Sequence, residues 1–221
     1  MDPGRRRALL LSAGGLAGTL LPAWPAAACR VFPLDGTLDF TVLRNGAAIG
    51  FHRIRFARRG GRFLVRSDIR FEVRRLGISA RRYEHHAEET WTDGWLTGLV
   101  SDTDDDGRLY RLRAETRGGV FQGKVNGRAF TVSGYIIPSS LWHRDTPAVE
   151  ALLDTVDGFV KTVRGRRLGQ DEIMVKGRAV RADHYALSGE INDHLWYDAD
   201  CALARVTRIG RDGVAIELAQ L

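Results

Sequence analysis

This 221-residue chain contains only two cysteines, Cys29 and Cys201, and no C-x-x-C pair. Zinc sites need clustered thiolate or imidazole ligands, so two isolated cysteines do not indicate one. The chain also lacks the nucleophile elbow G-x-S-x-G, the phosphate loop G-x-x-x-x-G-K-[ST] and the dinucleotide motif G-x-G-x-x-G. We therefore assign no catalytic residue, no metal ligand and no cofactor.

A strong charge of either sign is absent as well. The formal net charge is +6, and residues 1–28 contribute three arginines and one aspartate to it, so the rest of the chain carries +4. The remaining arginines are spread along the sequence and form no cluster. We expect no nucleic-acid partner, and mild basicity fits peripheral contact with an anionic membrane surface.

Residues 1–28 have the order of an export signal. The arginines at 5–7 precede an apolar run from Ala8 to Leu21, and small residues follow at Ala26 to Ala28. The run is too short and too rich in glycine for a membrane anchor. Because Arg-Arg precedes the run, the segment resembles a twin-arginine signal, with an ordinary secretory signal as the alternative. We predict periplasmic localisation and cleavage after Ala28.

Cys29 has more than one interpretation. The sequence "AAAC" resembles a bacterial lipobox with Ala26 where leucine is usual, so a lipid-anchored form is one alternative. In an oxidising compartment two cysteines often pair. We favour a Cys29–Cys201 disulfide, which would add about 2–4 kcal/mol of stability; free thiols stay open.

Residues 29–221 read as strands almost throughout. In "RFLVRSDIRFEVRR", one face carries the apolar side chains of Phe63, Val65, Ile69, Phe71 and Val73, and the other carries the charged side chains of Arg66, Asp68, Arg70, Glu72 and Arg74. Strict alternation predicts half-buried antiparallel strands. Turn dipeptides separate the strands at Asn45-Gly46, Gly60-Gly61, Asp93-Gly94, Asp106-Gly107, Gly118-Gly119, Asn126-Gly127 and Asp212-Gly213. We predict an all-β fold of roughly ten strands: a strongly curved antiparallel meander that forms an incomplete barrel or half-barrel.

The segment 134–158 interrupts the alternation. Thr146-Pro147 followed by apolar residues predicts one short helix near 147–154. Segments of this length usually cover a cavity or a partner, so we expect a lid-like insert in a single domain spanning 29–221.

Four stretches occur in order along the chain: "FTVLRNGAAIGFHRIRF", "YEHHAEETWTDGWLTGLVSDTDDDG", "PSSLWHRD" with "LLDTVDG", and "HLWYDAD". Together they resemble an uncharacterised family of bacterial exported, β-rich proteins catalogued as a domain of unknown function. The resemblance implies no reaction and no ligand. The architecture that this resemblance implies is similar to that of periplasmic proteins with a large curved sheet, and some of those proteins bind acyl chains. This is an analogy at the level of the fold.

Three polar motifs could each be a functional site or have only a structural role. Glu84, His86 and Glu88 share one strand face and suit a divalent metal, but arginines at 66, 70 and 74 offer cross-strand ion pairs, which we favour. Ser140 lies near His143, which is weak evidence for a hydrolase. The residues Asp102, Asp104 and Asp106 before Gly107 begin like a calcium loop, yet Arg113 stands where the bidentate acid belongs, so we favour a hairpin tip.

The aromatic and apolar residues of the insert suggest a ligand site. We predict that the pocket or its lid contains Ile136, Ile137, Leu141, Trp142, Trp91 and Trp196. The leading hypothesis is a non-enzymatic periplasmic binding or carrier protein for a lipid or another apolar or amphipathic ligand. The alternatives are a module that binds envelope proteins and, with less support, a hydrolase or metal-dependent enzyme acting on envelope material.

Overall fold

The computed structural model of the protein describes residues 36–75, 78–210 and 212–221. The predicted leader, its cleavage site and Cys29 lie outside the described residues. The described chain forms one fifteen-stranded sheet, largely antiparallel, which confirms the all-β prediction. None of its helical segments has the length and hydropathy of a membrane span.

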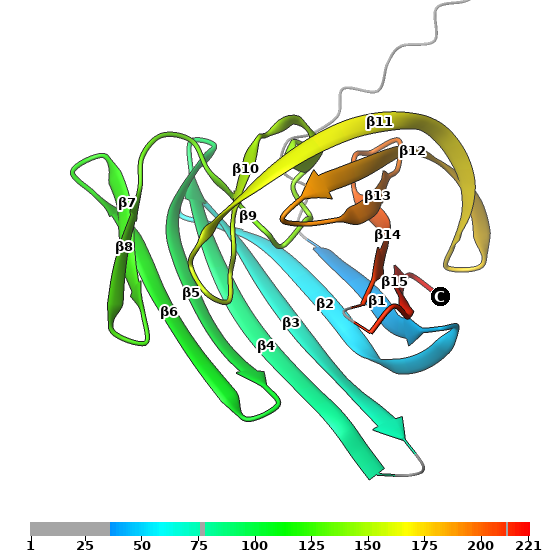
Figure 1. Cartoon of the computed structure of the whole chain (residues 1–221). Coiled ribbons are helices and arrows are strands. Elements are labelled where there is room, and N and C mark those ends of the chain that lie inside the picture. The colour runs from blue at the N-terminus through cyan, green and yellow to red at the C-terminus, as the bar shows by residue number, and fades with distance from the viewer. Residues whose placement is uncertain (1–35, 76–77, 211) are drawn as a thin grey trace, which may run out of the picture.

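The N-terminal half of the sheet is a meander in which each strand pairs with the next (Figure 1). Its strands are β1 (Gly36–Arg44), β2 (Ala47–Arg59), β3 (Arg62–Arg75), β4 (Ile78–Thr92), β5 (Trp95–Asp105), β6 (Arg108–Arg117), β7 (Val120–Val125) and β8 (Arg128–Val132). The alternation of residues 62–75 places Phe63 and Val65 in the core and leaves Arg66 and Arg70 on the outer face.

The C-terminal half continues the sheet from the other edge of β1, which pairs antiparallel with β15. Its strands are β11 (Val160–Val175), β12 (Arg178–Gly189), β13 (Asp193–Tyr197), β14 (Leu203–Ile209) and β15 (Ala215–Ala219). Irregular register at five strand pairs bends the sheet, because an extra residue on one strand increases the local twist. In the described chain the strand order ends at β8 and at β9, so the barrel is incomplete.

Tight hairpins form at six of the seven predicted turns with both central residues at positive φ, from Asn45-Gly46 to Asn126-Gly127. This is the geometry that Asn-Gly and Asp-Gly favour. At the seventh, Gly213 but not Asp212 has positive φ. A further hairpin, between β11 and β12, uses Lys176-Gly177, a pair that the sequence did not single out.

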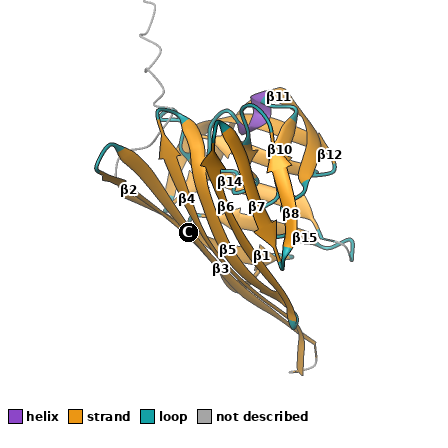
Figure 2. Cartoon of the chain, turned by 90° about the vertical axis from the view of Figure 1, so that its left-hand side faces the viewer, coloured by secondary structure: helices purple, strands orange, loops and turns teal. Residues whose placement is uncertain are grey.

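The insert 134–158 contains strand in place of the helix predicted near 147–154. It forms β9 (Ile137–Pro138), a single 3-10 turn η1 (Thr146–Ala148) beside β11, and β10 (Ala151–Leu153) (Figure 2). The helix prediction was therefore wrong beyond the first turn. Pro147 does begin a turn, but the apolar run 151–153 pairs with β11, where the sheet satisfies its backbone groups.

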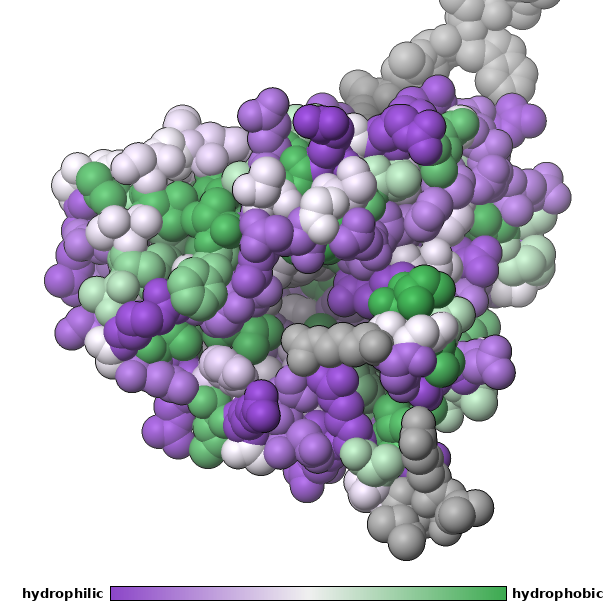
Figure 3. Space-filling view, in the orientation of Figure 1, coloured by the Kyte–Doolittle hydropathy of each residue, from purple (hydrophilic) through white to green (hydrophobic). Residues whose placement is uncertain are grey.

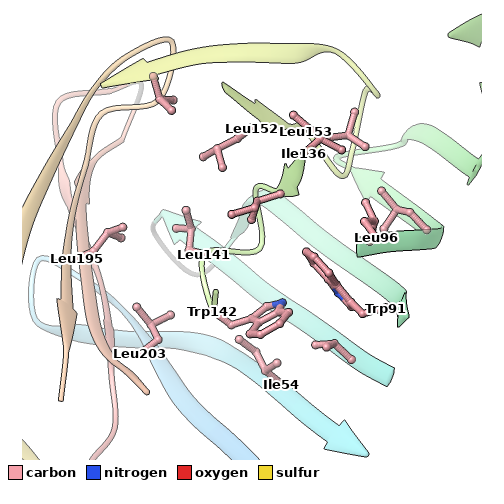
Figure 4. Packing of buried hydrophobic residues seen from close by; sticks show 14 of the residues in the cluster. Ile54, Trp91, Leu96, Ile136, Leu141, Trp142, Leu152, Leu153, Leu195 and Leu203 are labelled. Carbon is pink, nitrogen blue, oxygen red and sulfur yellow. The ribbon is translucent and has the colours of Figure 1, made fainter. Parts of the chain in front are cut away.

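The insert fills the concave side of the curved sheet. Gly165 permits its close approach to β11, since a Cβ there would lie 1.9 Å from the Pro147 carbonyl oxygen. Figure 4 shows Leu141 and Trp142 between the two halves of the sheet, facing Ile54 and Leu203. Around Leu141 and Trp142, the space between the two walls is thus occupied by the insert.

Candidate functional site

A buried carboxylate joins the insert to strand β4. Glu89 is only 1% exposed. Its Oε2 accepts hydrogen bonds from the indole Nε1 of Trp91 at 2.8 Å and of Trp142 at 3.0 Å, and its Oε1 accepts one from the Ser140 hydroxyl at 2.6 Å. Two of these donors belong to the insert, so Glu89 anchors the insert to the inner face of the sheet.

Burial raises the pKa of Glu89, and the three donors oppose that rise. A carboxyl group in this position meets protein on every side, so it has the environment of a structural anchor. Ser140 donates to Glu89, and the Ser140–His143 hydrolase alternative has no support from this geometry. Ser139 accepts a hydrogen bond from the Thr155 backbone N–H at 3.3 Å, which orders the same loop.

Replacing Glu89 by alanine is expected to destabilise the fold by about 3 kcal/mol, because two buried indole donors and the partly buried Ser140 hydroxyl lose their acceptor. Glu89→Gln is expected to cost less than about 1 kcal/mol, since an amide oxygen can accept both indole N–H groups and an amide N–H can donate to Ser140. Urea unfolding at neutral pH measures both. Because the pKa of Glu89 is raised on folding, Glu89→Gln should also gain stability relative to the wild type as the pH rises above 4.5. Equal losses for the two variants would contradict the anchor.

A second polar contact holds the end of the insert. His85 Nδ1 shares a hydrogen bond with the Thr103 hydroxyl at 2.7 Å, and its Nε2 lies 3.3 Å from the Thr155 hydroxyl. Ser101 donates to the backbone oxygen of Thr155. Tyr197 from β13 donates to the Leu141 carbonyl at 2.7 Å. These bonds hold the insert from both walls of the sheet, and Leu141 keeps a positive φ of 64° between them.

The six residues predicted for the pocket are all buried, with exposed fractions of 0–7%. Five of them pack in one cluster: Ile136, Ile137, Leu141, Trp142 and Trp91. Trp196 lies apart, in a small cluster with Ile173, Ala182 and Ala204. The structure therefore brings five of the six together, where they fill the interior of the sheet.

Two surface cavities lie elsewhere. One, of about 470 Å³, lies along the outer face of β2 to β6 and includes Phe51, Glu84, His86 and Leu109 in its wall. The other, of about 530 Å³, lies between the Pro147–Glu150 segment and the start of β11. The six predicted pocket residues line neither of them.

The charged residues of β4 make ion pairs across the sheet. Glu84 pairs with Arg70 and Glu88 pairs with Arg66, each at 3.0 Å, and His86 Nδ1 lies 2.7 Å from Asp68. The favoured ion-pair interpretation is thus confirmed at these two arginines, whereas Arg74 pairs with Glu72 on its own strand. No group of three or more His, Cys, Asp or Glu residues in the described ranges is arranged to hold a metal.

The sequence "SDTDDDG" is the end of β5 and the tip of the β5–β6 hairpin. Asp104 accepts a hydrogen bond from the Gly107 backbone N–H at 2.7 Å, and Asp102 pairs with Arg113 at 2.8 Å. The segment thus has the hairpin geometry that we favoured over a calcium loop.

Cys201, at the β13–β14 turn, carries no free thiol. Its predicted partner Cys29 lies outside the described residues, so the Cys29–Cys201 disulfide stays a prediction.

One end of the sheet exposes aromatic side chains among arginines. The tips of the β2–β3, β4–β5 and β6–β7 hairpins lie at this end, and the chain leaves β8 there toward Tyr135. Trp95, 53% exposed, packs edge-on against Tyr135, 42% exposed, with ring centroids 5.5 Å apart. We define the rim as this end of the sheet, with the residues Arg58, Arg59, Arg62, Trp95, Arg117, Val120 and Tyr135.

The rim is basic. Arg58, Arg59 and Arg62 are exposed at the β2–β3 tip, and Arg117 pairs with Glu115 at the β6–β7 tip. Two acids also belong to this region: Asp93 lies in the β4–β5 turn, and Asp145, whose charge acts on Tyr135, pairs with Arg144 at 3.2 Å. Figure 3 shows apolar side chains exposed on the side of the molecule that carries β5 to β8.

Sequence reasoning missed the rim because its residues come from separate hairpins. The available signal was positional: Trp95 and Val120 directly follow predicted tight turns, where large apolar residues have little to pack against. A curved sheet gathers alternate hairpin tips at one end, and that grouping appears only once the strand order is known.

Comparison with solved structures supports the fold. The chain is similar to a "Beta-barrel-like Protein of Domain of Unknown Function DUF1849 from Brucella abortus", with a TM-score of 0.61 and 11% identity over 84% of this chain and 94% of that one. This likeness shows the fold alone. No curated protein matches the sequence. Residues 40–219 match the model of a domain of unknown function, DUF6134, and the chain belongs to that family.

Proposed function

We propose that this protein is an exported, non-enzymatic binding protein of the periplasm that engages an anionic amphipathic ligand, a lipid surface, through the rim. The observation that carries the proposal is the exposed Trp95–Tyr135 pair at the end of the sheet where arginines of the β2–β3 tip are also exposed. Export and periplasmic localisation rest on the signal-like order of residues 1–28.

Aromatic exposure supports an interfacial ligand. Tryptophan and tyrosine combine an apolar ring with a polar group, and they concentrate where one side is apolar and the other is wet. Trp95 and Tyr135 contact each other and remain about half exposed, while Trp91 and Trp142 are buried. Val120, 37% exposed, extends the apolar surface of the rim.

The charge of the rim supports an anionic partner. Arginines near a membrane surface contribute about 1 kcal/mol each through attraction to acidic lipids. Arg59 and Arg62 face each other across the β2–β3 turn, so both can reach one surface. Strand β1 also begins near this end, since Gly36 pairs with Phe56.

The test uses protein purified from the periplasm of an expressing bacterium. Vesicles of phosphatidylethanolamine and phosphatidylglycerol should sediment the protein at low salt, and neutral phosphatidylcholine vesicles should not. Binding should weaken as salt screens the arginines. The double variant Arg59→Ser with Arg62→Ser is expected to lose about fivefold in partitioning per arginine, and Trp95→Ala should also weaken binding.

The matched controls lie on the β11–β12 hairpin, away from the rim. Arg178→Ser removes an exposed arginine and Met174→Ala an exposed apolar side chain. Both should bind vesicles like the wild type. Equal losses in the controls, or no vesicle binding by the wild type, would overturn the lipid surface as the ligand. Absence of the protein from the periplasmic fraction would overturn export.

A carrier that holds its ligand inside the sheet is the other form of this proposal. The five clustered residues of the predicted pocket are buried in one core cluster, so a ligand bound among them would have to displace part of the insert. Organic extraction of the periplasmic protein, followed by mass spectrometry, tests this form. A stoichiometric co-purified lipid would favour it, and its absence would leave the rim as the binding surface.

A further inference from the structure

Three polar side chains form a continuous hydrogen-bonded chain on the surface of the C-terminal half. His184 on β12 and His194 on β13 share a hydrogen bond of 2.8 Å between Nε2 and Nδ1. The other ring nitrogen of His184, Nδ1, lies 2.9 Å from Asp171 Oδ2 on β11. The order is therefore carboxylate, imidazole, imidazole, across three neighbouring strands.

The inner members of this chain are held rigidly. Trp196 donates its indole N–H to the same Asp171 oxygen at 2.8 Å, and its ring stacks on that of His184 with centroids 4.1 Å apart. Trp196 itself is only 7% exposed. His184 is thus fixed by a carboxylate on one nitrogen and by an aromatic face, whereas His194 is exposed and can turn.

We propose that His184 and His194 form a binding site for a divalent transition-metal ion, with Cu²⁺ as the preferred ion and water completing its coordination. On binding, the His194 ring proton moves from Nδ1 to Nε2, so that His194 Nδ1 and His184 Nε2 both offer a lone pair to the metal, while His184 keeps its proton on Nδ1 facing Asp171. Asp171 is a positioning residue that orients His184 and contributes no ligand atom. The site therefore has two protein ligands, which is consistent with the absence of three-residue metal clusters in the part of the chain described.

The two nitrogens are close enough to bind one ion together. Metal–imidazole bonds are about 2.0 Å long, so two ligand nitrogens on one ion lie about 2.8–3.3 Å apart. The observed 2.8 Å is the hydrogen bond that now joins the rings, and His194 has to turn for its Nδ1 lone pair to point at the ion. Square-planar or tetragonal coordination by nitrogen is typical of Cu²⁺, which also binds most tightly among the divalent first-row ions.

The surroundings of His184 suit a ligand. Metal-bound histidines usually donate their second ring N–H to a carboxylate, which fixes the tautomer, and Asp171 occupies that place. The positive charge of Arg205 opposes the binding of a cation nearby. The Arg205 guanidinium lies over the Trp196 ring at 5.2 Å from its centroid, and this charge is paired with Glu217 at 2.7 Å.

The experiment is a Cu²⁺ titration of the periplasmic protein, followed by electron paramagnetic resonance and by competition with a chelator of known affinity. We expect one tetragonal Cu²⁺ per chain with nitrogen hyperfine splitting. His194→Ala should weaken binding at least tenfold and remove one nitrogen from the spectrum. Asp171→Asn should weaken binding about tenfold or more while keeping the spectrum of two nitrogens.

The matched control is His86→Ala, which removes a half-exposed histidine that also lies beside a carboxylate, Asp68. It should leave Cu²⁺ binding unchanged. His194 is exposed, so its replacement should not unfold the protein, and a thermal melt of each variant checks this. Absence of binding by the wild type, or equal binding by His194→Ala and the wild type, would overturn the site. Loss of binding in His86→Ala alone would place the ion on β4 and would also overturn it.

Discussion

Lowering the pH from 7.5 to 5 is expected to destabilise the folded protein by about 2 kcal/mol for each of two buried histidines, His52 and His85. Burial lowers the pKa of His52 from 6.5 to about 3 and that of His85 from 6.5 to about 4. A histidine with a lowered pKa stabilises the fold fully above 6.5. Its contribution is lost as the pH falls toward its folded value, because the unfolded chain takes up the proton first.

The physical cause is the position of these rings on the inner face of the sheet. His52 is 4% exposed and shares a hydrogen bond of 2.8 Å with the Ser67 hydroxyl. The charged and titratable groups that influence it are His85, Arg208 and Asp68, of which only Asp68 favours the protonated form.

His85 has a similar environment. The charges that act on it are His86, which opposes its protonation, and Asp102 and Asp68, which favour it, but burial is the largest effect. If His85 is protonated, both of its ring nitrogens become donors, and the hydroxyl groups of Thr103 and Thr155, which hold the end of the insert, both have to accept.

Urea unfolding measured at several pH values tests this expectation. The double variant His52→Gln with His85→Gln keeps a polar side chain at both positions and removes both titrations. Its stability should fall by about 4 kcal/mol less than that of the wild type over the same range. Buried acids whose pKa is raised, such as Asp154 and Asp193, act in the opposite direction in both proteins and cancel in the comparison. Parallel curves for the two proteins would contradict the prediction.

Replacing Trp142 by alanine is expected to destabilise the protein by about 3–5 kcal/mol, the range for removing a large buried aromatic side chain. Trp142 is 2% exposed and contacts the rings of Phe56, Phe63 and Trp91 at centroid distances of 5.5–5.8 Å. The change also removes one of the donors to Glu89. Denaturant unfolding, with the slope compared between variants, measures the loss.

Trp95→Ala is the matched control, because Trp95 is 53% exposed at the rim. Its cost should stay within about 0.5 kcal/mol. A loss below 1 kcal/mol for Trp142→Ala would mean that the insert is not packed as Figure 4 shows.

The strands and turns were predictable because their determinants are local. Alternation fixes which side chains can share a face, and Asn-Gly or Asp-Gly pairs adopt positive φ at little cost. The helix predicted near 147–154 failed for the opposite reason. Leu152 and Leu153 are buried because β9 and β11 lie on either side of them, and short apolar runs do not distinguish a buried strand from a helix.

The pocket residues illustrate a mixed outcome. Their size and apolar character were enough to predict that Ile137, Leu141 and Trp142 associate with Trp91. Whether they line a space or fill it depends on the curvature of a sheet whose partners are far apart in sequence. Trp196 does not join this cluster. Strand β13 buries residues on both of its faces, and the Trp196 side chain packs in the separate small cluster.

The sequence by itself determined the all-β class, the hairpin tips and the alternation of charged and apolar faces, since each depends on residues within a few positions of one another. Only the tertiary structure decided that the insert fills the interior, that Glu89 receives two indoles, that Trp95 meets Tyr135, and that His184 meets His194. These contacts join separate strands, and their partners are set by strand order and curvature, which the chain acquires only when the whole sheet closes around its core.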